Sequence, residues 1–410
     1  MAYATNVPVV PQAEDGPTPV WTMVKLDDVA RRGSGHTPRK SAPEYWHGEI
    51  PWISLQDSAQ LDQPFLNETA VNITPAGVAN SSAKLHPAGT VVLSRDAGVG
   101  RSTIMAVDMA VSQHFIAWTC GPRLLNTFLY YYLQSQKGEF ERIAIGSTIK
   151  TIGLPYFKEF QVPLPPLKEQ QAIAEALSDA DALIEGLERL IAKKRLIKQG
   201  AMQDLLTAKR RLPGFSGKWE TKRLAEIGQV KTGLTYSPKN VSSYGTLVLR
   251  SSNIQNDRLA FADNVFVDLG VSDEATVRTG DLLICVRNGS RQLIGKTAMI
   301  DQRADGMAFG AFMSAYRSEL NDYLVWCFQS SVIQKQVAEH LGATINQITN
   351  KTLKAIEVPL PLDDEERKAI SLVLTDMDAE IQALEIRFEK ARQVKEGMMQ
   401  NLLTGRIRLT

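Results

Sequence analysis

The chain has 410 residues, of which 44% are hydrophobic and 22% charged, and its formal net charge is +1. This length exceeds one ordinary domain and suits two or three, and the composition is that of a globular protein. The sequence has no run of about 18 apolar residues, which excludes a protein that spans a membrane through helices. Residues 189–211 nevertheless carry eight Lys and Arg against one acid, Asp204. A near-neutral chain can therefore still present a basic face to nucleic acid.

The N-terminal residues and the cysteines bear on the cellular compartment. Residues 1–20 contain four prolines and no basic region ahead of an apolar core, so they do not resemble a signal peptide, and we expect a disordered lead-in. The three cysteines, Cys120, Cys285 and Cys327, lack metal-ligand spacing. Their odd number favours buried structural thiols in a reducing cytoplasm.

The two halves of the chain repeat each other. Trp21 begins the segment WTMVKLDDVARRGSGHTP, and 198 positions later Trp219 begins WETKRLAEIGQVKTGLTYSP. From Gly146 runs GSTIKTIGLPYFKEFQVPLP, which returns as GATINQITNKTLKAIEVPLP from Gly342, at an offset of 196. The segment AMQDLLTAKRRL from Ala201 returns as MMQNLLTGRIRL at an offset of 197. This period is too long for a solenoid repeat and predicts a tandem duplication of one domain with an attached arm.

Each copy changes character at its VPLP segment. Before it, short apolar runs such as TVVLSR and LLICVR alternate with turns rich in Gly, Ser and Asn, which is typical of short strands mixed with a few helices. After it a long helix is expected, because the prolines at 162–166 and 358–361 hold the chain rigid ahead of a helix start. Asp363 with Glu366 forms a variant of the capping box. The prediction is mixed α/β (α+β) domains at 21–161 and 212–357, and long helices at 162–211 and 358–410.

The long helices carry the clearest periodicity. Their apolar residues follow 4-3-4-3 spacing, the seam of a coiled coil, and six shared positions are each separated by 197 residues. Copies related by a pseudo-twofold axis pack antiparallel. At about 1.5 Å per residue, roughly 40 residues give a spacer of about 60 Å between the two domains. The alternative is two surface helices, each packed on its own domain, with a wider and less strict stripe. The residues predicted to pair the helices are Ile173, Leu177, Ile184, Leu187, Ile191, Ile370, Leu374, Met377, Ile381, Leu384 and Phe388.

No residue pattern indicates catalysis. The segment GSRQLIGKT at 289–297 is similar to a phosphate-binding loop, but five residues separate its glycines where that loop needs four. Since GVGRST occupies the matching place in the first copy, we interpret the element as a turn with a cation, Arg101 or Lys296. The five histidines lack metal-ligand spacing, and no nucleophile elbow or dinucleotide fingerprint occurs in the sequence. We expect no catalytic residue, no metal and no cofactor in this chain.

The order of these parts resembles the specificity subunit of type I restriction-modification systems. The resemblance covers about residues 21–410, and its most specific pieces are GSTIK at 146–150 and VPLPPLKEQ at 162–170. The second copy departs at Asn346, which replaces the lysine, and at 365–367. The resemblance implies two target-recognition domains that each read one half of a split DNA site, while the helices fix the gap and dock two methyltransferase subunits. Motor-nuclease subunits would complete the complex, and S-adenosylmethionine, ATP and Mg would bind to these partners.

Polar loops between matching framework positions are the candidate DNA contacts. Arginine suits guanine, Asn and Gln suit adenine, and Lys or Thr suits phosphate. Arg95 and Arg287 are the strongest candidates, because each follows a buried strand at places that we take to be equivalent. In the first domain the predicted contacts are His36, Thr37, Arg39, Lys40, Ser54, Gln56, Asp57, Arg95, Asp96, Arg101, Gln113, His114, Thr148 and Lys150. In the second they are Thr235, Tyr236, Lys239, Arg250, Ser252, Asn253, Arg287, Asn288, Arg291, Lys296, Asn346, Gln347 and Lys351.

Two other functions stay open on the sequence alone. A scaffold that binds protein partners through its repeats would lack a salt-dependent affinity for DNA. A fused nuclease or methyltransferase would need a carboxylate-metal cluster or cofactor loop in both copies. The basic run at 193–198 either follows DNA between half-sites or is a solvated face or partner contact, and its absence from the second helix favours the latter. A modification complex without motor-nuclease subunits would use the same chain.

Overall fold

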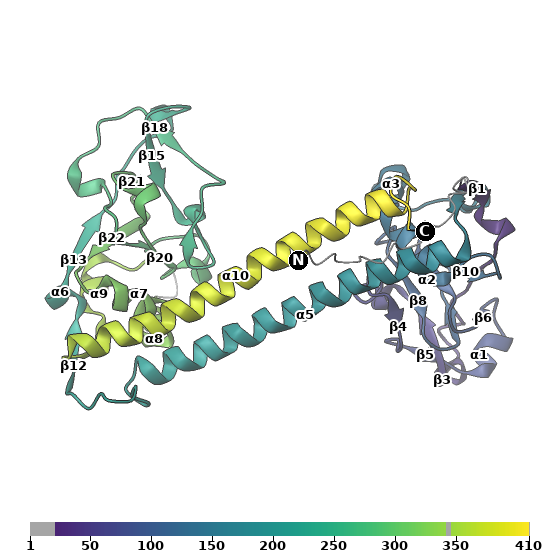
Figure 1. The fold of residues 1–410 in the computed structure, drawn as a ribbon, viewed down its shortest axis with the longest axis horizontal. Coiled ribbons are helices and arrows are strands. Elements are labelled where there is room, and N and C mark those ends of the chain that lie inside the picture. Colours follow the sequence, from purple (N-terminus) through teal and green to yellow (C-terminus); the bar gives the residue numbers. More distant parts are fainter. Residues whose placement is uncertain (1–20, 342–345, 410) are drawn as a thin grey trace, which may run out of the picture. The chain divides into compact units, whose positions relative to one another are not determined.

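The computed structural model describes residues 21–341 and 346–409 (Figure 1). The predicted lead-in at 1–20 lies outside the described residues. The chain divides into two compact units, one formed by Leu187–Arg387 and the other by the residues on either side of that segment. Each unit contains one α/β domain, part of helix α5 (Leu167–Leu205) and part of helix α10 (Asp364–Leu402). Among the described helices, none combines the length and the apolar character that a bilayer crossing requires.

The domain of the first unit is built on two sheets. Strand β7 (Val91–Ser94) is buried along its whole length, because its apolar run is covered on both faces. Trp118, Phe128 and Phe157 fill the core beside it. One sheet has the strand order β2 (Ala30–Ser34), β10 (Phe115–Cys120), β7, β8 (Ser102–Met105) and β4 (Phe65–Leu66). The other sheet has the order β5 (Asn72–Ile73), β3 (Trp46–Ile53), β9 (Met109–Val111) and β6 (Leu85–His86). The short helices are α1 (Pro75–Ala79), α2 (Asn126–Ser135), α3 (Lys137–Ile143) and α4 (Leu154–Lys158).

The domain of the second unit repeats this topology. One sheet has the order β13 (Gln229–Thr232), β22 (Met313–Arg317), β19 (Leu282–Cys285), β20 (Thr297–Met299), which corresponds to β2, β10, β7 and β8. A second sheet contains β14 (Val241–Ser242), β18 (Phe266–Val267), β15 (Thr246–Leu249) and β21 (Ala308–Phe309), and its parallel β15–β21 pair corresponds to β3–β9. A hairpin joins β16 (Ile254–Gln255) to β17 (Arg258–Leu259), and the helices are α6 (Leu224–Ile227), α7 (Asn321–Gln329), α8 (Ser331–His340) and α9 (Asn350–Ala355).

The VPLP segments are strands that close their domains. Strand β1 (Thr22–Lys25) pairs antiparallel with β11 (Gln161–Leu164), and β12 (Trp219–Arg223) pairs in the same way with β23 (Glu357–Pro361). Prolines are tolerated in such edge strands, which need no further backbone donor. The long helices accordingly begin only at Leu167 and Asp364. Asp363 caps α10, because its carboxylate accepts a hydrogen bond from the N–H of Glu365 at 3.0 Å. The reciprocal half of the predicted capping box is wrong, since Glu366 accepts from the side chains of Arg211 and Trp219 instead.

The two long helices run antiparallel where they meet inside each unit. In the first unit, Ile173 and Leu177 of α5 share a core with Leu402 of α10, and in the second, Ile370 and Leu374 of α10 share one with Met202 and Leu205 of α5. The start of each helix therefore packs both on its own domain and on the end of the other helix. Of the residues predicted to pair the helices, those buried are Ile173, Leu177, Leu187, Ile191, Ile370, Leu374 and Ile381, and those partly buried are Ile184, Met377, Leu384 and Phe388.

Two matching glycines explain one repeated motif. A Cβ atom at Gly35 would lie 1.6 Å from the carbonyl oxygen of Val111, and one at Gly233 would lie 2.2 Å from that of Gly310. Both distances are far below van der Waals contact. Each domain therefore needs glycine where the chain after the first sheet strand crosses the second sheet.

Candidate nucleic-acid interface

In the first domain the structure brings predicted contacts from three segments into one groove of about 690 Å³. Trp46 and Trp52 line this groove, and their rings pack edge to face with 5.4 Å between the ring centres. An aromatic surface with polar groups at its rim suits nucleic-acid bases. We name this the first groove, and its predicted contacts are Thr37, Lys40, Ser54, Gln56, Gln113 and His114.

A chain of hydrogen bonds orders one side of the first groove. The Thr37 hydroxyl donates to Gln113 Oε1 (2.7 Å), and Gln113 Nε2 lies 3.4 Å from His114 Nε2. His114 Nδ1 lies 2.9 Å from a carboxylate oxygen of Asp96, whose side chain is almost buried. With its Nδ1 proton directed at Asp96, the imidazole accepts at Nε2 from the Gln113 amide. The amide of Gln113 is thereby held in one orientation at an exposed position.

In the second domain an equivalent groove of about 710 Å³ forms from the matching segments. Thr235 and Tyr236 correspond to the segment of Thr37, and Arg250 and Ser252 correspond to Ser54 and Gln56. Phe312, 57% exposed, lies at the place of His114. We name this the second groove. The same location in the two copies therefore carries different side chains.

Asp57 and Asn253 belong to the framework of the grooves. Each is fully buried at the third position of a short 3-10 helix, η3 (Leu55–Asp57) or η5 (Ser251–Asn253), and each accepts a hydrogen bond from the backbone N–H three residues earlier. Asp57 also accepts from the N–H of Ala70. With no exposed surface, neither side chain can reach DNA in this structure, which corrects the prediction that they contact it.

Arg95 and Arg287 are not equivalent, contrary to the interpretation of the sequence. The last residues of β7 and β19 each accept a hydrogen bond from the glycine of the following turn, at 2.9 and 2.8 Å, which aligns these two strand ends. Arg95 then corresponds to the buried Val286, and Arg287 corresponds to Asp96. Asp96 forms a β-bridge with Thr151 and Arg287 forms one with Gln347, and these partners lie at matching places ahead of the VPLP strands, which supports the same alignment.

Most of the predicted arginines and Lys296 are bound to protein groups. Their partners are backbone carbonyls, an acid or a hydroxyl of neighbouring loops, so part of their hydrogen-bonding capacity is already used within the protein. Arg39 donates to Ser41, Arg95 to the carbonyls of Gln113 and Ile152, and Arg101 to that of Ser58; Arg250 pairs with Asp263, Arg291 donates to the carbonyls of Ala338 and Leu341, and Lys296 to that of Ile254.

The remaining predicted contacts are either bonded within the protein or exposed. Asn288 donates to Ser251, which lines the second groove, and Asn346 donates to the carbonyl of Gly289. Gln347 is partly buried, in the β-bridge to Arg287. The others lie at exposed positions from which they can meet a ligand: His36, Lys40, Gln113, Thr148, Lys150, Thr235, Lys239 and Lys351.

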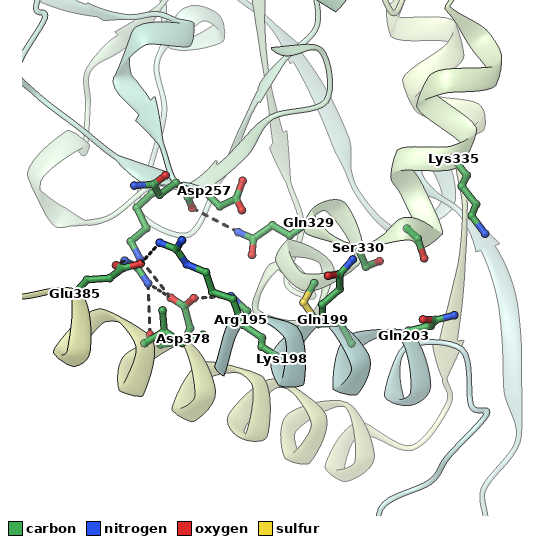
Figure 2. A pocket seen from close by; sticks show the side chains of 15 residues that line it. Arg195, Lys198, Gln199, Gln203, Asp257, Gln329, Ser330, Lys335, Asp378 and Glu385 are labelled. Carbon is green, nitrogen blue, oxygen red and sulfur yellow. Dashed lines mark hydrogen bonds and ion pairs between the residues drawn. The ribbon is translucent and has the colours of Figure 1, made fainter. Parts of the chain in front are cut away.

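Three of the four cations in the basic run of α5 pair with acids of α10. In the second unit Lys194 pairs with Glu380. Arg195 pairs with Glu385 and Lys198 with Asp378 (Figure 2). Because these three cations are paired across the helices, the basic run is explained by contact between the helices and not by binding to DNA.

The hairpin of the second domain joins this cluster through Arg258, which bonds to both Asp378 and Glu385. Burial alone would raise the pKa of the Asp378 carboxyl, but hydrogen bonds from Lys198 and Arg258 outweigh it and hold that pKa below its ordinary value. The first unit carries the matching cross-helix pair, Asp181 with Lys395. The Tyr131 hydroxyl also donates to the Asp181 carboxylate.

A second set of contacts, which we name the clasps, was missed from the sequence. In the second unit Arg211 and the indole N–H of Trp219 both donate to Glu366, at 2.6 and 3.2 Å, and the guanidinium lies over the indole ring. In the first unit Arg408, Trp21 and Glu169 make the same arrangement. The signal was present, because all three residue types recur at offsets of 197 or 198.

The cysteines and acids offer no reactive centre among the described residues. Cys285 and Cys327 are buried and Cys120 is partly buried, all as free thiols. Burial raises the pKa of Cys120 and Cys327 to about 12 and that of Cys285 to about 11, so these thiols stay protonated. Within 21–341 and 346–409, no group of three His, Cys, Asp or Glu side chains is placed to hold a metal.

Comparison with known proteins identifies the family. A profile described as the type I restriction modification DNA specificity domain matches residues 20–193 and, a second time, residues 216–389. The chain belongs to this family. The resemblance seen in the sequence, the mixed α/β fold class and the internal duplication are confirmed.

The chain is similar to specificity subunits along most or part of its length. It is 24% identical to the type I restriction enzyme MjaVIII specificity subunit of Methanocaldococcus jannaschii over 95% of this chain and 93% of that one. To the MjaIX specificity subunit of the same organism it is 28% identical, over about half of each chain, 52% in both cases. The fold resembles the crystal structure of a type I restriction-modification S subunit from M. genitalium, with a TM-score of 0.58, 17% identity and coverage of 95% and 98%.

Proposed function

We propose that this specificity subunit reads a split DNA target, with each recognition domain contacting one half-site through its groove. The observation that carries the proposal is the convergence of predicted contacts in matching grooves, from three separate segments in the first groove and from two in the second. The framework around the grooves is matched, while the side chains in them differ. Such an arrangement suits two half-sites of different sequence.

In this proposal the paired helices fix the gap between the half-sites and dock two methyltransferase subunits. The cross-helix ion pairs and the clasps would keep the helices in one register, so that the gap is constant. Adenine methylation from S-adenosylmethionine, and ATP- and Mg-dependent translocation and cleavage by motor-nuclease subunits, would reside in these partners in the cytoplasm. The role left to this chain is DNA specificity, as the description of its family states. Its three cysteines, whose thiols stay protonated, would have a structural role.

Methylation of host DNA tests the proposal. The chain is co-expressed with its methyltransferase subunit, and methylated adenines are mapped by sequencing. A motif with two defined halves and a fixed undefined gap is expected. Exchange of residues 219–355 for those of a relative should change one half and leave the other unchanged.

A matched pair of lysine variants separates the groove from the general surface. Lys40→Ala removes an exposed charge in the first groove, and Lys158→Ala removes one on α4 outside it. Only Lys40→Ala should weaken DNA binding. If the purified complex neither methylates nor binds DNA, the chain is a protein-binding scaffold instead.

A further inference from the structure

One arginine differs from the other predicted DNA contacts. Among the six arginines nominated from the sequence, five bond to protein groups. The guanidinium of Arg287 has no hydrogen bond or ion pair to the described part of the chain, and the side chain is exposed. A guanidinium carries five N–H donors, and no described residue accepts a hydrogen bond from those of Arg287.

The Arg287 side chain rests on an aromatic platform. Its guanidinium carbon lies 5.0 Å from the centre of the Phe312 ring, which belongs to the second groove and is itself 57% exposed. Stacking on a ring orients the guanidinium plane while leaving its N–H edge free. An exposed phenylalanine at this place is otherwise costly, so its burial by a ligand is favourable.

The backbone beneath this pair is held from two sides. The N–H of Arg287 donates to the carbonyl of Phe312 at 3.1 Å, and Arg287 forms a β-bridge with Gln347. The next residue, Asn288, donates to Ser251 of η5 at 3.0 Å. A pre-positioned side chain loses little conformational entropy on binding, which favours a contact that discriminates between bases.

We propose that Arg287, stacked on Phe312, recognises the guanine of one G·C pair in the half-site read by the second domain. The planar fork of arginine matches the O6 and N7 acceptors of guanine in the major groove, a pairing that no other base offers. The first domain has Asp96 and His114 at the corresponding places, so the recognition is confined to the second half-site. This inference rests on the proposed function.

Methylation mapping of variants gives the first test. The wild type should yield a second half-site with an invariant G·C pair. Arg287→Ala, and Arg287→Lys, which keeps the charge but loses the fork, should make that one position degenerate, with discrimination falling on the order of 10- to 100-fold. Phe312→Leu should reduce discrimination less, and Arg278→Ala, an exposed arginine outside the second groove, should change nothing. The first half-site serves as an internal control of folding.

Competition binding decides the matter if a variant loses methylation altogether. The complex with the methyltransferase subunit is titrated with target DNA containing guanine or 7-deazaguanine, which lacks the N7 acceptor, at the invariant pair. The modified base should weaken binding by the wild type and leave Arg287→Ala unaffected. An equal loss in both proteins, an unchanged motif in Arg287→Ala, or a second half-site without a G·C pair overturns this inference. A wild type that yields no split motif contradicts the proposed function itself.

Discussion

Replacing Arg211 by methionine leaves a buried negative charge in the second clasp without its partner. Glu366 has no exposed surface, whereas the Arg211 side chain is 25% exposed. Removing one member of a buried ion pair costs about 3–5 kcal/mol, and the partial exposure of the arginine places the expected loss near the lower end, about 3 kcal/mol. In a unit of this size, each kcal/mol lowers the melting temperature by about 2–4 °C. We therefore expect a decrease of roughly 6–12 °C.

Calorimetry of the single and double variants tests this reasoning. Adding Glu366→Gln to Arg211→Met removes the buried charge and keeps an acceptor for the Trp219 indole, which donates to Glu366 at 3.2 Å. The double variant should regain more than half of the lost stability, because the penalty comes from the unpaired charge and not from the missing contact. A single variant that melts within about 2 °C of the wild type, or a double variant no more stable than the single, refutes the argument.

Three further predictions concern the framework, the pH and the DNA backbone. Gly35→Ala should destabilise the first unit by about 1–3 kcal/mol or more in urea unfolding, because its Cβ would overlap a carbonyl, whereas Gly138→Ala, with no atom within 4 Å, should not destabilise it. Although burial raises the pKa of Glu169, hydrogen bonds led by Arg408 hold that pKa below its ordinary value. The ionised Glu169 carboxylate therefore stabilises the fold fully above about pH 5, and this contribution is lost as the pH falls below about 4. Glu169→Gln should flatten the pH profile of the urea midpoint in that range. Lys150→Ala should reduce the salt dependence of DNA binding by about one unit of slope, measured by titration at several salt concentrations, with the methylation motif unchanged.

The fold was predictable from the sequence where the repeat and the heptads specified it. Offsets of 196 to 198 residues revealed the duplication, and strict spacing at positions such as Ile173 and Ile370 marked the residues that the structure buries. The VPLP strands were not predictable in the same way. Proline indicates an extended chain but not its partner, and here that partner, β1 or β12, lies about 140 residues earlier in each copy.

The grooves were only partly predictable, because exposure and pairing depend on tertiary contacts. Polar loops at matching places located the three segments that meet in the first groove and two of those in the second, but they missed the segment of Phe312. Residue type alone could not distinguish a free side chain from one that braces the fold. Asp57 and Asn253 are capping residues, and Arg101 is tied to a backbone carbonyl, although all three were plausible contacts. The misalignment of Arg95 with Arg287 arose because each follows an apolar run, although Val286 lies between the end of the strand and Arg287 in the second copy.

The two-stranded ribbons place the beginning and the end of each recognition domain next to each other. Thr22 lies opposite Leu164 in the first, and Trp219 lies opposite Pro361 in the second. Neighbouring strands are about 5 Å apart, so the polypeptide leaves each domain where it came in. The second domain is thus an insertion between α5 and α10, and a replacement cassette has to keep the apolar surface that packs on Ile370 and Leu374. New target specificity can then arise by exchanging a cassette at these two ribbon positions, while the register of the helices is inherited unchanged.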